Sequence, residues 1–216
     1  HLMRVYPLAF IQQSDETYQL VSVVAFNASQ PLFVDEKGNW LAGYIPAYLR
    51  QYPFAIQRTD KGAALAFNTD SGLLLDTVSS DGNRFFDDNG DPSESLQAVQ
   101  TFLSASEKSR LQTQALTELL VQYDLLTPWL VSGEGDEQEV RCYCVNEKKL
   151  ATLDADALKS LTASGALKLA YAQRMSMPRL ELLQQVAKQR SQATVDLDDV
   201  DIESLFDDDD DVLSFD

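Results

Sequence analysis

Residues 38–54 have the sequence GNWLAGYIPAYLRQYPF, which combines closely spaced aromatic residues with Pro46 and Pro53. Proline is favoured at the first position of a helix, and the residue before a proline is driven out of the helical region. A helix of about two turns is therefore predicted from Pro46 to Tyr52. Because so short a helix is not stable alone, its aromatic residues are expected to pack against the rest of the protein.

On both sides of this stretch, short runs rich in β-branched and aromatic residues predict a β-rich N-terminal half. The predicted strands are Val5–Ile11, Tyr18–Phe26, Pro31–Val34, Phe54–Arg58, Ala63–Asn68 and Leu73–Leu75. The first two are predicted to pair as a β-hairpin, as are the fourth and fifth. Residues 35–39 form a predicted turn, in which Gly38 is available for a positive φ angle.

A long helix is predicted after the turn at Phe85–Gly90. Asp91 is a suitable N-cap, Pro92 suits the first helical position, and Glu94 suits the third. Apolar residues then recur at steps of three and four to about Leu126. The middle of this face is small or polar, which indicates either close approach by a neighbouring element or a break into two helices.

The C-terminal half is predicted to mix strands and helices. Its elements are a strand at Val140–Val145, a short helix capped by Asn146, a helix capped by Asp154 and ending at Gly165, a strand at Ala166–Arg174, and a helix at Met177–Arg190 capped by Ser176. The second strand is predicted because Leu167, Leu169 and Tyr171 alternate with other residues. The predicted fold class is α+β: a β-rich half with hairpins, a long helix and a mixed C-terminal half packed as one domain, followed by an acidic tail.

Charge divides the chain into a predicted globular domain at residues 1–190 and an acidic tail at residues 191–216. The formal charge is −17, and 11 of the 34 acidic residues lie in the tail, which has no basic residue. The domain is only mildly acidic, so no nucleic-acid-binding face is predicted, and no apolar run is long enough to span a membrane. The tail is too highly charged to fold alone and is predicted to be flexible.

Apolar residues among the acids predict that the tail is an interaction segment. Ile202, Leu205 and Phe206 are the candidate partner-binding residues. Such a segment suits a hydrophobic groove with a basic rim, because the acidic residues steer the approach. A solvated tail with incidental apolar residues is the alternative.

The chain has few residues of the kinds that catalysis and metal binding require. Cys142 and Cys144 are its two cysteines, and His1 is its single histidine. Zinc needs four ligands and a nucleophilic triad needs a histidine, so buried strand cysteines are expected and no metal or cofactor is predicted.

Residues 87–91, DDNGD, have oxygen-bearing side chains at alternating positions, as calcium loops do. The sixth position of such a loop would be Pro92 instead of glycine, and the twelfth would be Ala98 instead of glutamate. A capping turn is therefore the favoured interpretation.

Several motifs of the chain resemble, in order, those of the SapC family of bacterial proteins. They are LFVD at 32–35, GNW at 38–40, YIPAYLR at 44–50, YPF at 52–54, FDDNG at 86–90, PW at 128–129, GAL at 165–167 and YA at 171–172. This resemblance implies histidine after the YA pair, where this chain has Gln173, and the acidic tail is outside the family pattern. It also implies a surface-layer association and an accessory role near flavin-dependent halogenase-like proteins, cupin-like proteins and outer-membrane receptors.

The predicted function is therefore non-enzymatic binding of a protein partner. The alternative is an enzyme, or a substrate-presenting subunit of a modification pathway with those neighbours, with a ligand site at Trp40, Tyr44, Tyr48 and Arg50. An arginine among aromatic side chains needs a carboxylate, a carbonyl or an anionic ligand, and a partner within the protein is favoured. With no visible signal peptide, a cytoplasmic location is predicted, whereas the family name implies the cell surface.

Overall fold

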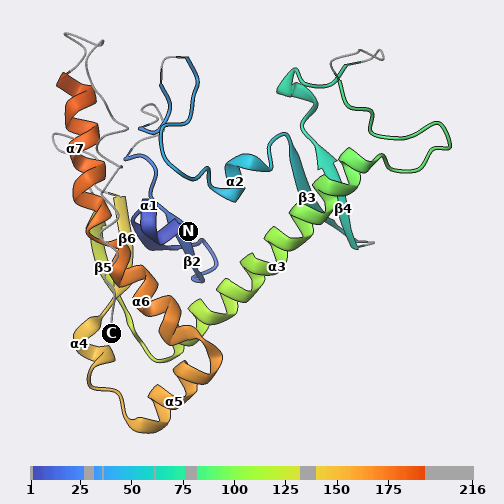
Figure 1. Ribbon diagram of the computed structural model, residues 1–216. Coiled ribbons are helices and arrows are strands. Elements are labelled where there is room, and N and C mark those ends of the chain that lie inside the picture. The colour runs from blue at the N-terminus through green and yellow to red at the C-terminus, as the bar shows by residue number, and fades with distance from the viewer. Residues whose placement is uncertain are drawn as a thin grey trace, which may run out of the picture. The chain divides into compact units, whose positions relative to one another are not determined.

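The computed structural model describes residues 2–26, 32–35, 37–60, 62–75, 82–131 and 140–192 (Figure 1). The chain forms two compact units, each considered by itself. His1–Tyr44 and Thr113–Asp216 form the first, here called the sheet unit, and Ile45–Gln112 form the second, here called the hairpin unit. The division at residue 190 stays a prediction, because residues 193–216 lie outside the described residues, with the candidates Ile202, Leu205 and Phe206 among them.

The sheet unit contains a four-stranded antiparallel sheet in the order β2-β1-β6-β5. Its strands are β1 Leu8–Gln12, β2 Tyr18–Ser22, β5 Leu126–Val131 and β6 Val140–Val145. The N-terminal hairpin and the strand at Val140–Val145 are thus confirmed. The start of the first predicted strand is wrong, because Val5 ends a short helix, α1 (Leu2–Val5). Pro128 lies in β5 at an edge of the sheet, where a missing N–H is tolerated.

The core of the sheet unit forms two clusters, because successive residues of a strand face opposite sides of a sheet. Ala9 of β1 packs in one cluster with Cys142 of β6 and with two residues of the helix α7 (Arg179–Gln192). These two residues, Leu183 and Val186, lie on the buried side of α7. Phe10, the next residue of β1, packs in the other cluster. That cluster also holds Leu120, Leu125, Val145, Leu150, Leu161, Ala166 and Ala170.

Helices α4 (Glu147–Leu150) and α5 (Ala155–Ser164) begin at the predicted capping residues. The Asn146 side chain accepts a hydrogen bond from the Lys149 N–H at 3.1 Å, and the Asp154 carboxylate accepts one from the Ala157 N–H at 2.7 Å. Gly165 ends α5 with a φ angle of 91°, a conformation that favours glycine because a Cβ atom strains it.

The strand predicted at Ala166–Arg174 is wrong: these residues belong to the helix α6, Ala166–Ser176. The alternating Leu167, Leu169 and Tyr171 are not its buried side. Instead, small and polar residues at helical spacing are fully buried, namely Ala166, Ala170, Gln173 and Ser176. Ser176 is consequently the last residue of α6, and it does not cap the following helix as predicted.

The hairpin unit is built from β3 (Phe54–Thr59) and β4 (Gly62–Phe67), which pair antiparallel as predicted. The helix α3 (Glu94–Gln122) begins in this unit and continues into the sheet unit as one helix, so the break into two helices, one of the two alternatives considered for its small and polar middle, does not occur. Its N-cap is Ser93, whose hydroxyl accepts from the Leu96 N–H at 3.2 Å. Asp91 is therefore not the cap. The residue that follows it, Pro92, lies before the helix and pairs with Phe86 in an isolated β-bridge.

Three further predictions around these elements need correction. The helix in the aromatic stretch, α2, is a single turn at Ala47–Arg50, and the Tyr52–Pro53 peptide bond that follows is cis. Leu73–Leu75 follow a 3-10 turn, η1 (Thr69–Ser71), as irregular exposed chain instead of a strand. In the described part of Pro31–Val34, only Val34 makes a β-bridge, to Trp40.

Within the described residues, no helix has both the length and the apolar character needed to cross a membrane.

Candidate functional site

Trp40 and Tyr44, two of the four candidate ligand-binding residues, lie in the sheet unit within a hydrogen-bonded aromatic cluster. The Trp40 indole N–H donates to the Tyr6 hydroxyl at 3.1 Å and to the Tyr44 carbonyl at 3.2 Å. The Tyr6 hydroxyl donates to the same carbonyl, and burial raises the pKa of Tyr6 to about 12. The indole ring also stacks on Phe33 with centroids 5.9 Å apart. The indole N–H of Trp40 is thus bonded within the protein, and together with the ring stacking it stabilises the aromatic cluster.

Tyr48 and Arg50, the other two candidates, lie on α2 in the hairpin unit. The Arg50 Nε donates to the Ile45 carbonyl at 3.0 Å, and its guanidinium lies 5.0 Å from the centroid of the Phe102 ring. The exposed Arg50 side chain thus has a carbonyl and an aromatic face as partners within the protein. The four candidates are therefore divided between two units, and their combined ligand site stays a prediction.

The expectation that every aromatic residue of the stretch packs inward is wrong for two of them. Tyr48 is 77% exposed and Tyr52 is 56% exposed. The physical reason is the single turn of α2, which is too short to present a continuous apolar side.

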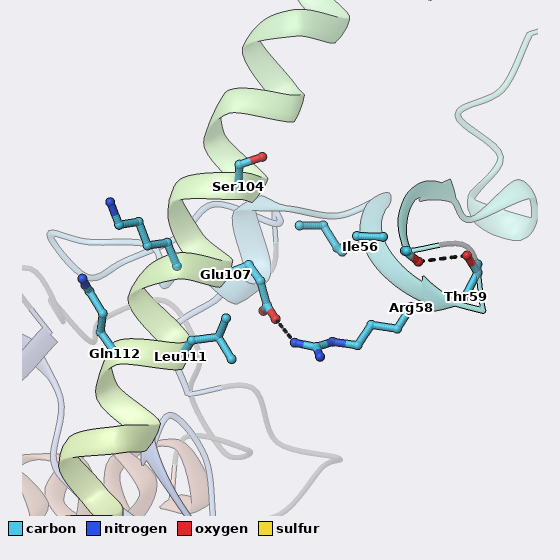
Figure 2. A pocket seen from close by; sticks show the side chains of 10 residues that line it. Ile56, Arg58, Thr59, Ser104, Glu107, Leu111 and Gln112 are labelled. Atoms are coloured by element: carbon cyan, nitrogen blue, oxygen red, sulfur yellow. Dashed lines mark hydrogen bonds and ion pairs between the residues drawn. The ribbon is translucent and has the colours of Figure 1, made fainter.

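A groove of about 730 Å³ lies between the β3–β4 hairpin and α3, entirely within the hairpin unit. Figure 2 shows Ile56 and Arg58 on the hairpin facing Ser104, Glu107 and Leu111 on the helix. Ala63 and Lys108 also line it. The volume falls in the range of about 300–1,000 Å³ that is usual for ligand sites. Sequence reasoning missed this groove, because its walls come from segments far apart in the chain.

Glu107 lines the groove and forms ion pairs with two arginines. Its Oε1 accepts from Arg58 at 3.1 Å and from Arg110 at 2.9 Å, and its Oε2 accepts from the Arg110 Nε at 2.7 Å. These bonds, chiefly those from Arg110, lower the pKa of Glu107 to about 2. The carboxylate is consequently ionised and shared by two guanidinium groups, which leaves an excess of positive charge at this place.

We expect Glu107→Gln to lower the free energy of unfolding by about 1 kcal/mol at pH 7, since exposed ion pairs contribute ~0.2–1 kcal/mol each. Folding lowers the pKa of Glu107 from 4.5 to about 2. The contribution is therefore complete above pH 4.5 and disappears as the pH falls through 2. Urea unfolding of both proteins across this pH range is the measurement. Adding Arg110→Gln to the variant should cost little more, and a difference that persists at low pH would contradict this account.

The two cysteines are buried in β6, as predicted, and neither forms a disulfide. Burial raises the pKa of both thiols, which disfavours the reactive thiolate. Among the residues that the structure describes, no three His, Cys, Asp or Glu side chains are grouped as metal ligands would be.

The DDNGD segment forms a turn held by Asp87. Its Oδ1 accepts from the backbone N–H groups of Asn89 and Asp91, each at 2.9 Å. Arg84 pairs with the neighbouring Asp88 at 2.8 Å. The side chains of this turn thus satisfy its own backbone, which agrees with the interpretation as a turn.

Exposed apolar side chains are concentrated in the hairpin unit. Ten of the 14 large apolar residues exposed in the described part of the chain belong to it: Ile45, Tyr48, Leu49, Tyr52, Leu65, Leu73, Leu74, Leu75, Phe86 and Leu111. Large exposed apolar patches commonly mark sites of protein contact, and these ten residues are the candidates for such a patch in this unit. Composition could not locate this feature, because apolar content alone does not say which side chains are buried.

Fold and surface together define an α+β protein with a four-stranded sheet, a long helix and a hairpin unit that exposes many large apolar side chains. The chain belongs to the SapC family, whose family model matches residues 1–183. No curated protein matches the sequence, and no solved structure matches the fold.

Proposed function

We propose that this SapC-family protein is a non-enzymatic accessory protein that binds a protein partner through its hairpin unit. The observation that carries the proposal is the concentration of exposed apolar side chains in Ile45–Gln112. Leaving Tyr48, Leu73 and Phe86 in water has a free-energy cost that binding would remove. The surface-layer association implied by the family name belongs to this proposal, so a surface-layer protein is the first partner to test.

The enzymatic alternative, with a site near Trp40 and Arg50, has less support. The Trp40 N–H already has two acceptors, and the Arg50 Nε already has a carbonyl. The buried thiols have raised pKa values, which disfavours their use as nucleophiles.

Site-specific photocrosslinking tests the binding proposal. A photoreactive phenylalanine analogue replaces Tyr48 in the full-length chain, and the same analogue replaces Tyr171 of α6 in a control. Both tyrosines are exposed, at 77% and 52% respectively, but only Tyr48 belongs to the hairpin unit. A defined adduct with one protein, formed from position 48 and absent from position 171, is the expected result. Equal labelling from both positions, or none from either, would overturn the proposal.

A further inference from the structure

We infer that the groove between β3–β4 and α3 binds the chain's own acidic–apolar C-terminal segment. The inference goes beyond the proposed binding function, because it assigns this groove of the hairpin unit a ligand from the same chain and not from a separate protein. The segment, residues 196–211, has the sequence DLDDVDIESLFDDDDD and lies outside the described residues.

The groove has an apolar lining that suits side chains such as Leu205 and Phe206 of the segment. Ile56 and Ala63 line it from the hairpin, and Leu111 lines it from α3 while remaining 46% exposed. Its volume of about 730 Å³ has room for a few large apolar side chains.

The charges around the groove complement those of the segment. Arg58 and Arg110 share the single carboxylate of Glu107, and Lys108 also lines the groove. The side chain of Arg58 remains 72% exposed in this arrangement. The basic groups therefore exceed the acidic group here, although the whole chain has a formal charge of −17. Such a place attracts an acidic peptide, and salt weakens the attraction.

The segment combines the two properties that the groove requires. Apolar residues alternate with acids from Val200 to Phe206, and five aspartates, Asp207–Asp211, follow directly. Apolar side chains would enter the groove while carboxylates remain at its basic rim. An apolar peptide without acids, or an acidic one without apolar residues, would satisfy only half of these contacts.

The test measures binding of a fluorescent peptide of residues 196–211 to the full-length protein by fluorescence anisotropy. The protein carries Leu205→Ser and Phe206→Ser, so that its own segment does not compete. We expect saturable binding that weakens as salt is added. Arg58→Glu should weaken it about tenfold by reversing a rim charge, and Leu111→Asp should abolish it. Arg84→Glu, which changes another ion-paired arginine of the same unit, should leave it unchanged.

A second peptide, with serine at positions 202, 205 and 206, retains every charge and should not bind. Equal binding of both peptides would show simple charge attraction and overturn the inference. The inference would also be overturned if Arg58→Glu and Arg84→Glu weakened peptide binding equally, in variants whose melting curves show that they are folded. Leu111→Asp is the second test of the same groove, and unchanged peptide binding by this folded variant would overturn the inference as well. Absence of peptide binding, alongside a defined adduct from position 48, would overturn this inference and leave the proposed function standing.

Discussion

Replacement of Gln173 by leucine is expected to lower the free energy of unfolding by about 2–6 kcal/mol. The Gln173 side chain is fully buried and joins two strands. Its Nε2 donates to the Leu8 carbonyl at 3.0 Å, and its Oε1 accepts from the Val145 N–H at 3.0 Å. Leucine would leave both backbone groups buried without a partner, at about 1–3 kcal/mol each. Chemical denaturation monitored by circular dichroism measures the loss.

The effect should be large because Gln173 supplies bonds that the sheet itself does not. Strands β1 and β6 pair only at Phe10 and Tyr143, and α6 completes their junction. Beside Gln173, the Ser176 hydroxyl accepts from the Leu8 N–H at 2.8 Å and donates to the Gln173 carbonyl at 2.6 Å. Both polar groups of Leu8 therefore depend on α6, so this helix helps to hold the two strands together.

Gln185→Leu is the matched control, because Gln185 is an exposed glutamine of α7. Its stability should change by no more than about 0.5 kcal/mol. Gln173→His should retain part of the stability at neutral pH, because a neutral imidazole has one donor and one acceptor. A loss as small for Gln173→Leu as for the control would show that Gln173 does not hold the two strands.

Trp40→Ala is expected to lower the free energy of unfolding by about 3–5 kcal/mol, as truncation of a packed tryptophan commonly does. The change removes the ring that stacks on Phe33 and the N–H that donates to Tyr6 and to the Tyr44 carbonyl. Trp40→Phe keeps a ring but loses the donor, so it should cost less. Denaturant unfolding of both variants separates the contribution of the packed ring to stability from that of the N–H donor.

Tyr48→Ala is the control from the same stretch of sequence. Because Tyr48 is 77% exposed, its truncation should change stability by no more than about 0.5 kcal/mol. If Trp40→Ala had the same stability as the unchanged protein, the packing and hydrogen bonds of Trp40 would not stabilise the fold. The account of the aromatic cluster as a stabilising part of the sheet unit would then be wrong.

Features set by neighbouring residues could be predicted from the sequence. The caps at Asn146 and Asp154 depend on N–H groups three residues away, and both are present in the structure. Gly165 ends α5 because its positive φ angle is strained for other residues. The two hairpins follow from apolar runs and the turns between them. The family resemblance could be predicted too, since its motifs are themselves local.

The tertiary structure decided which side of each element is buried and which residues meet. Alternating leucines predict a strand at Ala166–Arg174, yet the residues form a helix because its small and polar side fits against β1 and β6. Gln173 finds its partners 28 and 165 residues away, and Arg58 meets Glu107 across 49 residues. Periodicity within one segment carries no information about such distant partners, so both the strand junction and the groove required the folded chain.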